Sequence, residues 1–273
     1  MLITPFTEVF GVEQPVVCGA MPATGTAELV AAVADAGALG FLGVPGGAAP
    51  GDLARQITRC RELTERPFGV DVTVLSSNDP APHAAYRDVI IGAGIPVVAT
   101  SGSEPEPHLL AFHAAGIKIV HRAVTVGHAR RAQDLGADAV MIDGLEAAGR
   151  AGAGEIDGLA FIAAAADQLT VPIIAGGRLA DGRGLVAALA LGASAINIGT
   201  RFLGRSQGLI DDVTSCGEVV ARIVDEAEDI ITGRLAGLVT LPGAGPQRRS
   251  SHAEPASETK LETALEAAWE AAP

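Results

Sequence analysis

Two short segments of the chain place glycine next to arginine at points where a strand is expected to end. One reads Ala175-Gly176-Gly177-Arg178 and the other reads Ile198-Gly199-Thr200-Arg201. Glycine lets a ligand approach the backbone closely, and backbone N–H groups at such turns bind phosphate. We therefore predict that the two segments together hold the phosphate of a cofactor or substrate. Each segment taken alone is equally well explained as a turn.

A longer segment, residues 143–152, combines small residues with charged ones. This composition suits a backbone that lies close to a planar ligand and is followed by a side chain that does chemistry. A merely flexible loop is the alternative interpretation.

Lys118 and His121 are polar residues within one apolar run. A cation in an apolar strand is costly unless it meets an anion or an electron-rich group, so Lys118 is a candidate ligand-binding residue. His121 ends the expected strand and is the histidine best placed to reach a site there. The structural alternatives are a lysine at a strand edge and a hydrogen-bonded histidine. Since no histidine and carboxylate cluster has metal-ligand spacing, we expect no metal.

The elements that must position these residues follow a regular pattern. Short apolar runs rich in β-formers alternate with amphipathic or alanine-rich stretches, which predicts βα units around a parallel sheet. Residues Thr26 and Asp181 are expected helix caps, and five glycine-containing segments that begin at residues 35, 92, 114, 135 and 191 are expected helix ends. The expected strands are 15–18, 39–44, 68–75, 96–100, 117–121, 139–143, 172–175 and 195–198.

Eight evenly spaced units favour a (β/α)8 TIM barrel of parallel strands over an open, doubly wound sheet, which remains the alternative. In such a barrel the site lies at the C-terminal ends of the strands, where both glycine segments fall. We predict one barrel domain over residues 1–242, closed by a C-terminal helix, and a flexible, disordered tail over residues 243–273.

The composition narrows the classes of partner. The chain has 273 residues, 48% of them hydrophobic, and a formal net charge of −13, which argues against nucleic acids and anionic membranes. Small molecules, or further copies of the chain in a homo-oligomer, are the expected partners. Three widely spaced cysteines and the absence of an export or membrane-spanning pattern favour a reduced, cytoplasmic location.

Segments 16–43, 143–152 and 171–203, the last reading VPIIAGGRLADGRGLVAALALGASAINIGTRFL, resemble the nitronate monooxygenase family, formerly called 2-nitropropane dioxygenases. The resemblance runs through nearly the whole barrel. It implies an oxidoreductase that holds FMN across the barrel mouth, with the flavin ring near residues 20–22 and the phosphate on the two glycine segments. The FMN contacts that the resemblance implies are Ala20, Met21, Pro22, Asp71, Lys118, Asp143, Ala148, Gly149, Gly176, Gly177, Arg178, Gly199 and Thr200.

The chain departs from the family pattern at several points. Arg150 replaces the usual proton-transferring histidine, and arginine stays protonated near neutral pH. We expect Arg150 either to hold an anionic substrate in the catalytic site or to be a solvated loop residue. Asp71 stands in place of an asparagine and Arg178 in place of a glycine. The helical cap subdomain that usually follows Leu203 is missing, so the site is expected to be open or covered by another subunit.

The sequence leaves three functions open. The first is oxidation of alkyl nitronates or a related carbanion by an FMN-dependent monooxygenase that uses O2, with Arg150 and His121 as candidate catalytic residues. The second is an NAD(P)H-dependent FMN reductase of quinones or enoyl thioesters, which needs no basic histidine for hydride transfer. The third is a barrel that has lost its chemistry and acts as a binding partner.

Overall fold

The computed structural model describes residues 2–20, 25–44, 49–73, 83–102, 106–144, 158–177, 179–203 and 214–239. Eight parallel strands pair in chain order, and β1 also pairs with β8, so the sheet is a closed barrel. This confirms the predicted (β/α)8 fold. The strands are β1 Val16–Cys18, β2 Leu39–Gly43, β3 Gly69–Thr73, β4 Val97–Ser101, β5 Lys118–Ala123, β6 Ala139–Asp143, β7 Ile173–Gly176 and β8 Ala195–Asn197.

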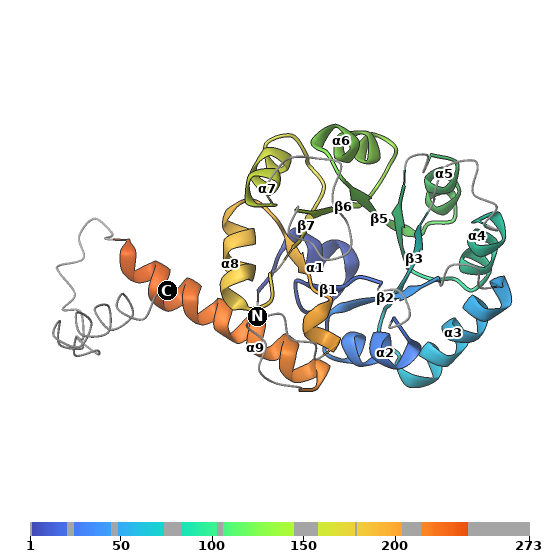
Figure 1. Cartoon of the computed structure of the whole chain (residues 1–273), viewed down its shortest axis with the longest axis horizontal. Coiled ribbons are helices and arrows are strands. Elements are labelled where there is room, and N and C mark those ends of the chain that lie inside the picture. The colour runs from blue at the N-terminus through green and yellow to red at the C-terminus, as the bar shows by residue number, and fades with distance from the viewer. Residues whose placement is uncertain are drawn as a thin grey trace, which may run out of the picture. The chain divides into compact units, whose positions relative to one another are not determined.

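A helix follows each strand and packs outside the ring, as Figure 1 shows. After β8, a 3-10 turn η1 (Thr200–Leu203) precedes α9, which continues into η2 (Ile230–Leu235) and η3 (Ala236–Leu238). The α-helices are α1 Pro5–Phe10, α2 Ala27–Asp35, α3 Pro50–Leu63, α4 His83–Gly92, α5 Glu106–Ala114, α6 Val126–Asp134, α7 Gly158–Ala166, α8 Gly182–Ala190 and α9 Cys216–Asp229.

Helix ends have the chemistry that the sequence predicts. The side chains of Thr26 and Asp181 accept hydrogen bonds from backbone N–H groups in the first turns of α2 and α8. The five predicted glycine stops all have positive φ, from 62° to 99°. The residue after each glycine donates back to a carbonyl five positions earlier, as Ile95 N does to Ile90 O at 3.3 Å. Each helix therefore stops in a left-handed turn that leads directly into the next strand.

The barrel interior is filled by apolar side chains that alternate along the strands with outward-facing ones. Val17, Phe41 and Met141 belong to this inner cluster and are at most 1% exposed. Gly69 has no room for a side chain, because an added Cβ would overlap the Phe41 ring. The Phe41 ring therefore packs directly on Gly69 and fills space inside the barrel.

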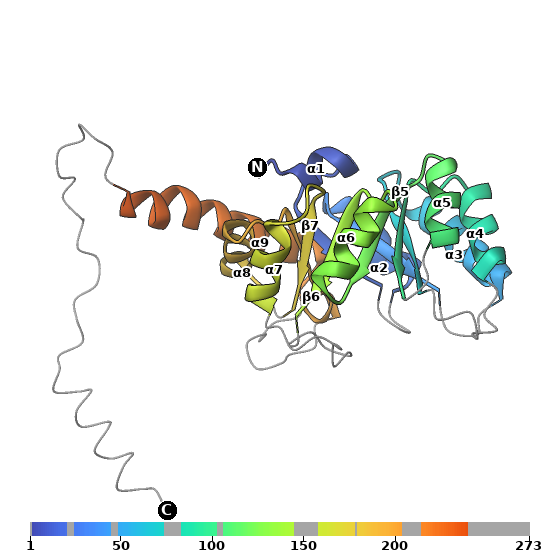
Figure 2. The same ribbon diagram turned by 90° about the horizontal axis from the view of Figure 1, so that it is seen from above.

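Helix α1 closes the N-terminal end of the barrel, as Figure 2 shows. It was not predicted, although its signals are in the sequence. Thr4 is the N-cap, Pro5 is in the first turn, and Thr4 and Thr7 form a reciprocal capping box. Phe6 and Phe10 pack with the inner cluster and are 0% and 6% exposed, so α1 seals this end with apolar surface.

Helix α9 completes the outer ring, as the predicted closing helix should. Its buried face includes Val219 and Ile223, and it packs on α8 and α2. Only residues 204–215 separate η1 from α9. This stretch is too short for the helical cap subdomain, in agreement with the prediction that the cap is missing.

The barrel lies in a compact unit, Met1–Ala236. The predicted tail, residues 243–273, falls outside the described residues, so the domain boundary remains a prediction. No helix in the described part of the chain is long and apolar enough to cross a membrane.

Gly182 allows α8 and α9 to pack closely. A Cβ added there would lie 2.6 Å from Ala227 N and 2.8 Å from Ile223 O, which are backbone atoms that cannot move independently. We therefore expect Gly182→Ala to lower the free energy of unfolding by about 1–3 kcal/mol. Gly127→Ala on α6 is the matched control, since nothing lies within 4 Å of its Cβ position. Urea unfolding of both variants checks this, and equal stability of the two would contradict the close packing of α8 on α9.

Candidate functional site

The barrel mouth, formed by the C-terminal ends of the strands, carries polar side chains that point into the barrel. Because side chains alternate along a strand, the inward-facing residues lie two positions beyond the inner apolar cluster. Arg122 follows Val120 in this way on β5, and Asp143 follows Met141 on β6. The inward positions at the mouth include Gly19, Gly43, Asp71, Ser101, Arg122, Asp143, Gly176 and Asn197.

Arg122 spans the mouth. Its Nη1 donates to Oδ2 of Asp143 at 2.5 Å, and its Nη2 lies 3.3 Å from the position that a Cβ on Gly19 would occupy. Strands β5 and β1 are on opposite sides of the closed ring, so the side chain reaches across it. The Arg122 and Asp143 side chains are only 21% and 17% exposed. A cation in this position must be paired, and Asp143 provides the partner charge.

Two glycines make room for this arrangement. Gly19 donates its N–H to Oδ1 of Asn197 at 2.9 Å, and a Cβ there would lie 2.8 Å from the same oxygen. A Cβ on Gly176 would overlap the Asp143 carboxylate. We call Gly19, Arg122, Asp143, Gly176 and Asn197 the mouth floor. It forms a hydrogen-bonding layer directly above the apolar interior.

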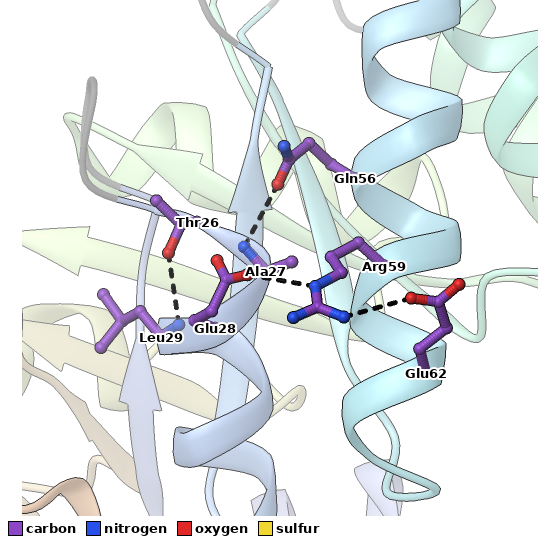
Figure 3. Close-up of polar contacts among 7 residues, drawn as sticks. All are labelled: Thr26, Ala27, Glu28, Leu29, Gln56, Arg59 and Glu62. Carbon is purple, nitrogen blue, oxygen red and sulfur yellow. Dashed lines mark hydrogen bonds and ion pairs between the residues drawn. The ribbon is translucent and has the colours of Figure 1, made fainter.

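The segment that leaves β1 is anchored at both ends. Asn197 holds Gly19, and Oε1 of Gln56 on α3 accepts from the N–H of Ala27 at 3.2 Å, where α2 begins. Figure 3 shows this contact beside the ion pair of Arg59 with Glu28, 3.2 Å long. In the sequence, the predicted ring-binding residues 20–22 fall between these two anchored positions.

The glycine segments after β7 and β8 also lie at the mouth. Gly177 has φ of 111°, a conformation that L side chains rarely adopt, and the carbonyl of Gly199 accepts from Phe202 N at 2.9 Å to start η1. The N-terminus of α8 is occupied, because the Asp181 side chain accepts from Gly184 N and Glu226 accepts from Gly182 N. An anion at these loops would therefore have to bind the segments themselves rather than α8.

Most predicted residues in the described part of the chain are brought together at this end. They are Ala20, Asp71, Asp143, Gly176, Gly177, Gly199 and Thr200. Six predicted residues lie outside the described residues, and their roles remain predictions: Met21, Pro22, Ala148, Gly149, Arg150 and Arg178. Within the described residues no group of three potential ligands is placed to hold a metal.

Lys118 is not at the mouth, so the structure argues against its expected contact with FMN. It is the first residue of β5, at the N-terminal end of the barrel, where its Nζ lies 3.4 Å from Oδ1 of Asp138. The expected strand ended at residue 121, whereas β5 runs to Ala123. This shift of two residues moves Arg122, which was not predicted, to the mouth.

His121 faces the helices rather than the interior, so its expected approach to the site was also wrong. It is 0% exposed, its Nδ1 lies 2.8 Å from Oγ1 of Thr100, and its Nε2 lies 3.2 Å from Nε2 of His128 on α6. Burial first, and then the charge of His128, lower the pKa of His121 from 6.5 to about 4. The hydrogen-bonded alternative is the one that the geometry supports.

Comparisons with known proteins agree with the fold and identify the family. A family model described as nitronate monooxygenase matches residues 4–225. The chain belongs to the nitronate monooxygenase family. A nitronate monooxygenase of Pseudomonas aeruginosa is 33% identical over 240 residues, which cover 72% of this chain and 68% of that protein.

Other relatives carry different names. The (3aS,4S,5R,7aS)-5-hydroxy-7a-methyl-1-oxo-octahydro-1H-indene-4-carboxyl-CoA dehydrogenase of Rhodococcus jostii is 35% identical over 212 residues, covering 77% of this chain but only 58% of that protein. The chain thus spans little more than half the length of this relative. A solved mutant of FabK from Thermotoga maritima superposes with a TM-score of 0.79 at 25% identity, covering 87% of this chain and all of that one.

The buried His121 gives a testable pH dependence of stability. Since its pKa is lower in the folded state, the unfolded state binds more protons between about pH 6.5 and pH 4, and stability falls as pH falls through this window. A shift of this size corresponds to about 3 kcal/mol at 1.4 kcal/mol per pH unit. We expect urea unfolding from pH 7 to pH 4 to show this loss, and His121→Gln to show less of it. His113→Gln, an exposed control, should keep the dependence of the parent. An unchanged slope in His121→Gln would contradict the burial argument.

Proposed function

We propose that the chain binds FMN at the barrel mouth and is an FMN-dependent oxidoreductase that acts on nitronates or related carbanions. The observation that carries the proposal is the mouth floor, in which a paired guanidinium and an amide lie above an apolar barrel interior. The family match supports a flavin, and the nitronate monooxygenase of Pseudomonas aeruginosa supports the substrate class. When bound, FMN would supply the electron-accepting group of the reaction.

The described residues fit the phosphate end of FMN. Gly177, with its positive φ, and the turn at Gly199 and Thr200 offer glycine backbone on two neighbouring strands. With α8 capped by Asp181 and Glu226, these segments are the backbone groups that would hold the phosphate. Arg178, the residue that follows Gly177 in the sequence, would add a charge-assisted contact.

The ring end fits the mouth floor. We assign to Arg122 the part that the sequence had suggested for Lys118, a cation beside the part of the ring where negative charge develops on reduction. Asp143 keeps this guanidinium oriented across the mouth. Ala20, which follows Gly19, would lie against the ring, and the mouth floor would keep water from the ring on its inner side.

The substrate assignment follows from proton chemistry. A nitronate is already an anion, so its oxidation needs no base to remove a proton, and the replacement of the family histidine by Arg150 does not disable the reaction. Arg150 would hold the nitronate oxygens through its fixed charge.

A second candidate is an NAD(P)H-dependent reductase or a dehydrogenase of acyl thioesters. The names of the Rhodococcus jostii relative, a carboxyl-CoA dehydrogenase, and of FabK favour this class. Hydride transfer likewise needs no basic histidine. A barrel without chemistry is the third candidate, and it predicts a protein that binds no flavin.

The decisive experiment mixes the flavin-loaded protein anaerobically with each class of electron donor. Bleaching of the flavin by an alkyl nitronate, followed by recovery with O2, is the expected result. Bleaching by NADH or NADPH but not by a nitronate would overturn the nitronate assignment in favour of the reductase. Heat release should yield FMN, and recovery of FAD, or failure to bind excess FMN, would contradict the cofactor assignment.

Three variants test which cation faces the ring. Arg122→Met should weaken FMN binding by about tenfold to a hundredfold, because it removes a charge-assisted contact and leaves Asp143 unpaired. Lys118→Met, at the opposite end of the barrel, should change the dissociation constant less than about twofold. Arg122→Lys should restore part of the loss, which separates a charge effect from misfolding. Fluorescence titration measures all three, and a larger effect at Lys118 than at Arg122 would reverse the assignment.

A further inference from the structure

Asn197 has a contact that the fold alone does not require. It is the last residue of β8, and its side chain turns inward at the mouth, where Oδ1 accepts the N–H of Gly19 at 2.9 Å. The strand pairing of β1 with β8 is complete without this bond, since Ile198 N donates to Val17 O at 2.9 Å one step along the same strands. The Asn197 amide therefore extends the connection past the end of the sheet to the first loop residue.

The surroundings of Gly19 match this contact closely. An added Cβ would lie 2.8 Å from Oδ1 and 3.3 Å from Nδ2 of Asn197, and 3.3 Å from Nη2 of Arg122. The amide and the guanidinium thus lie around the same backbone position. A longer or apolar side chain at residue 197 would leave the Gly19 N–H without its acceptor, which is costly in a half-buried position.

We propose that Asn197 is a positioning residue that fixes the start of the β1–α2 loop, residues 19–26, at the mouth. The inference rests on the proposed function, because the same loop carries Ala20, Met21 and Pro22, the residues proposed to lie against the flavin ring. Asn197 sets the first end of the loop and Gln56 sets its other end at Ala27. Loss of the first anchor removes the side-chain contact at Gly19 and leaves the contact of Ala27 with Gln56 at the other end.

Two variants test whether the acceptor oxygen of residue 197, rather than the volume of its side chain, holds Gly19. Asn197→Asp keeps an oxygen that accepts from Gly19, and Asn197→Leu keeps similar volume but no acceptor. Amide hydrogen exchange of the ligand-free protein, read at Gly19 and at Ile198, reports the anchor without any flavin. We expect Asn197→Leu to speed exchange at Gly19 by at least about tenfold relative to Ile198, and Asn197→Asp to stay within about threefold of the parent.

FMN titration supplies the second readout. Asn197→Leu should weaken FMN binding by about tenfold or more, and Asn197→Asp should restore most of the affinity. Ser194→Ala, directly before the start of β8, is the control and should leave both readouts unchanged. If the parent binds no flavin, the proposed function fails while the exchange data still decide the anchor. Parent-like exchange at Gly19 in Asn197→Leu, or equal acceleration at Gly19 and Ile198, would overturn the inference.

Discussion

The ion pair of Arg122 with Asp143 separates the apolar interior of this barrel from its polar mouth. The guanidinium reaches from one side of the ring toward the other, where little of it is exposed to solvent. An unpaired charge in such a position is costly, so a carboxylate must compensate it. The pair in turn requires glycine at residues 19 and 176, since a side chain at either position would meet it or the neighbouring Asn197. The ion pair and Asn197 thus restrict the size of residues at two further positions, Gly19 just after β1 and Gly176 on β7.

The fold was easier to predict than the site, because the two depend differently on the exact ends of the strands. Apolar runs and glycine stops recur with every βα unit, so the barrel follows even when each strand boundary is wrong by a residue or two. A site residue depends on the boundary itself. Ending the expected strand at residue 121 instead of Ala123 made His121 the residue nearest the mouth and concealed Arg122. Lys118 was assigned from the family resemblance, and it lies at the other end of β5.

Other parts of the site had weaker signals in the sequence. The mouth positions of Asp143, Gly176, Gly177, Gly199 and Thr200 were predicted because these residues lie at or just after the ends of strands that were located to within one residue. Asn197 was not found, because one asparagine at a strand end is a common feature and its partner, Gly19, is distant in sequence. The acidic Asp71, by contrast, was recognised as a departure, and the structure places it among the inward-facing residues of β3. Alternation along a strand of known bounds is the rule that would have found Arg122.

A double-mutant cycle tests whether Arg122 and Asp143 act together to support the mouth floor. The variants are Arg122→Met, Asp143→Asn and the pair together, and the quantities are the free energy of unfolding and the FMN dissociation constant. If the pair supports the mouth floor, the two substitutions are coupled by about 1–3 kcal/mol in stability, and the double variant binds FMN at least about tenfold more weakly than the parent. Additive effects on stability together with parent-like FMN binding in the double variant would show that the ion pair does not support the mouth floor.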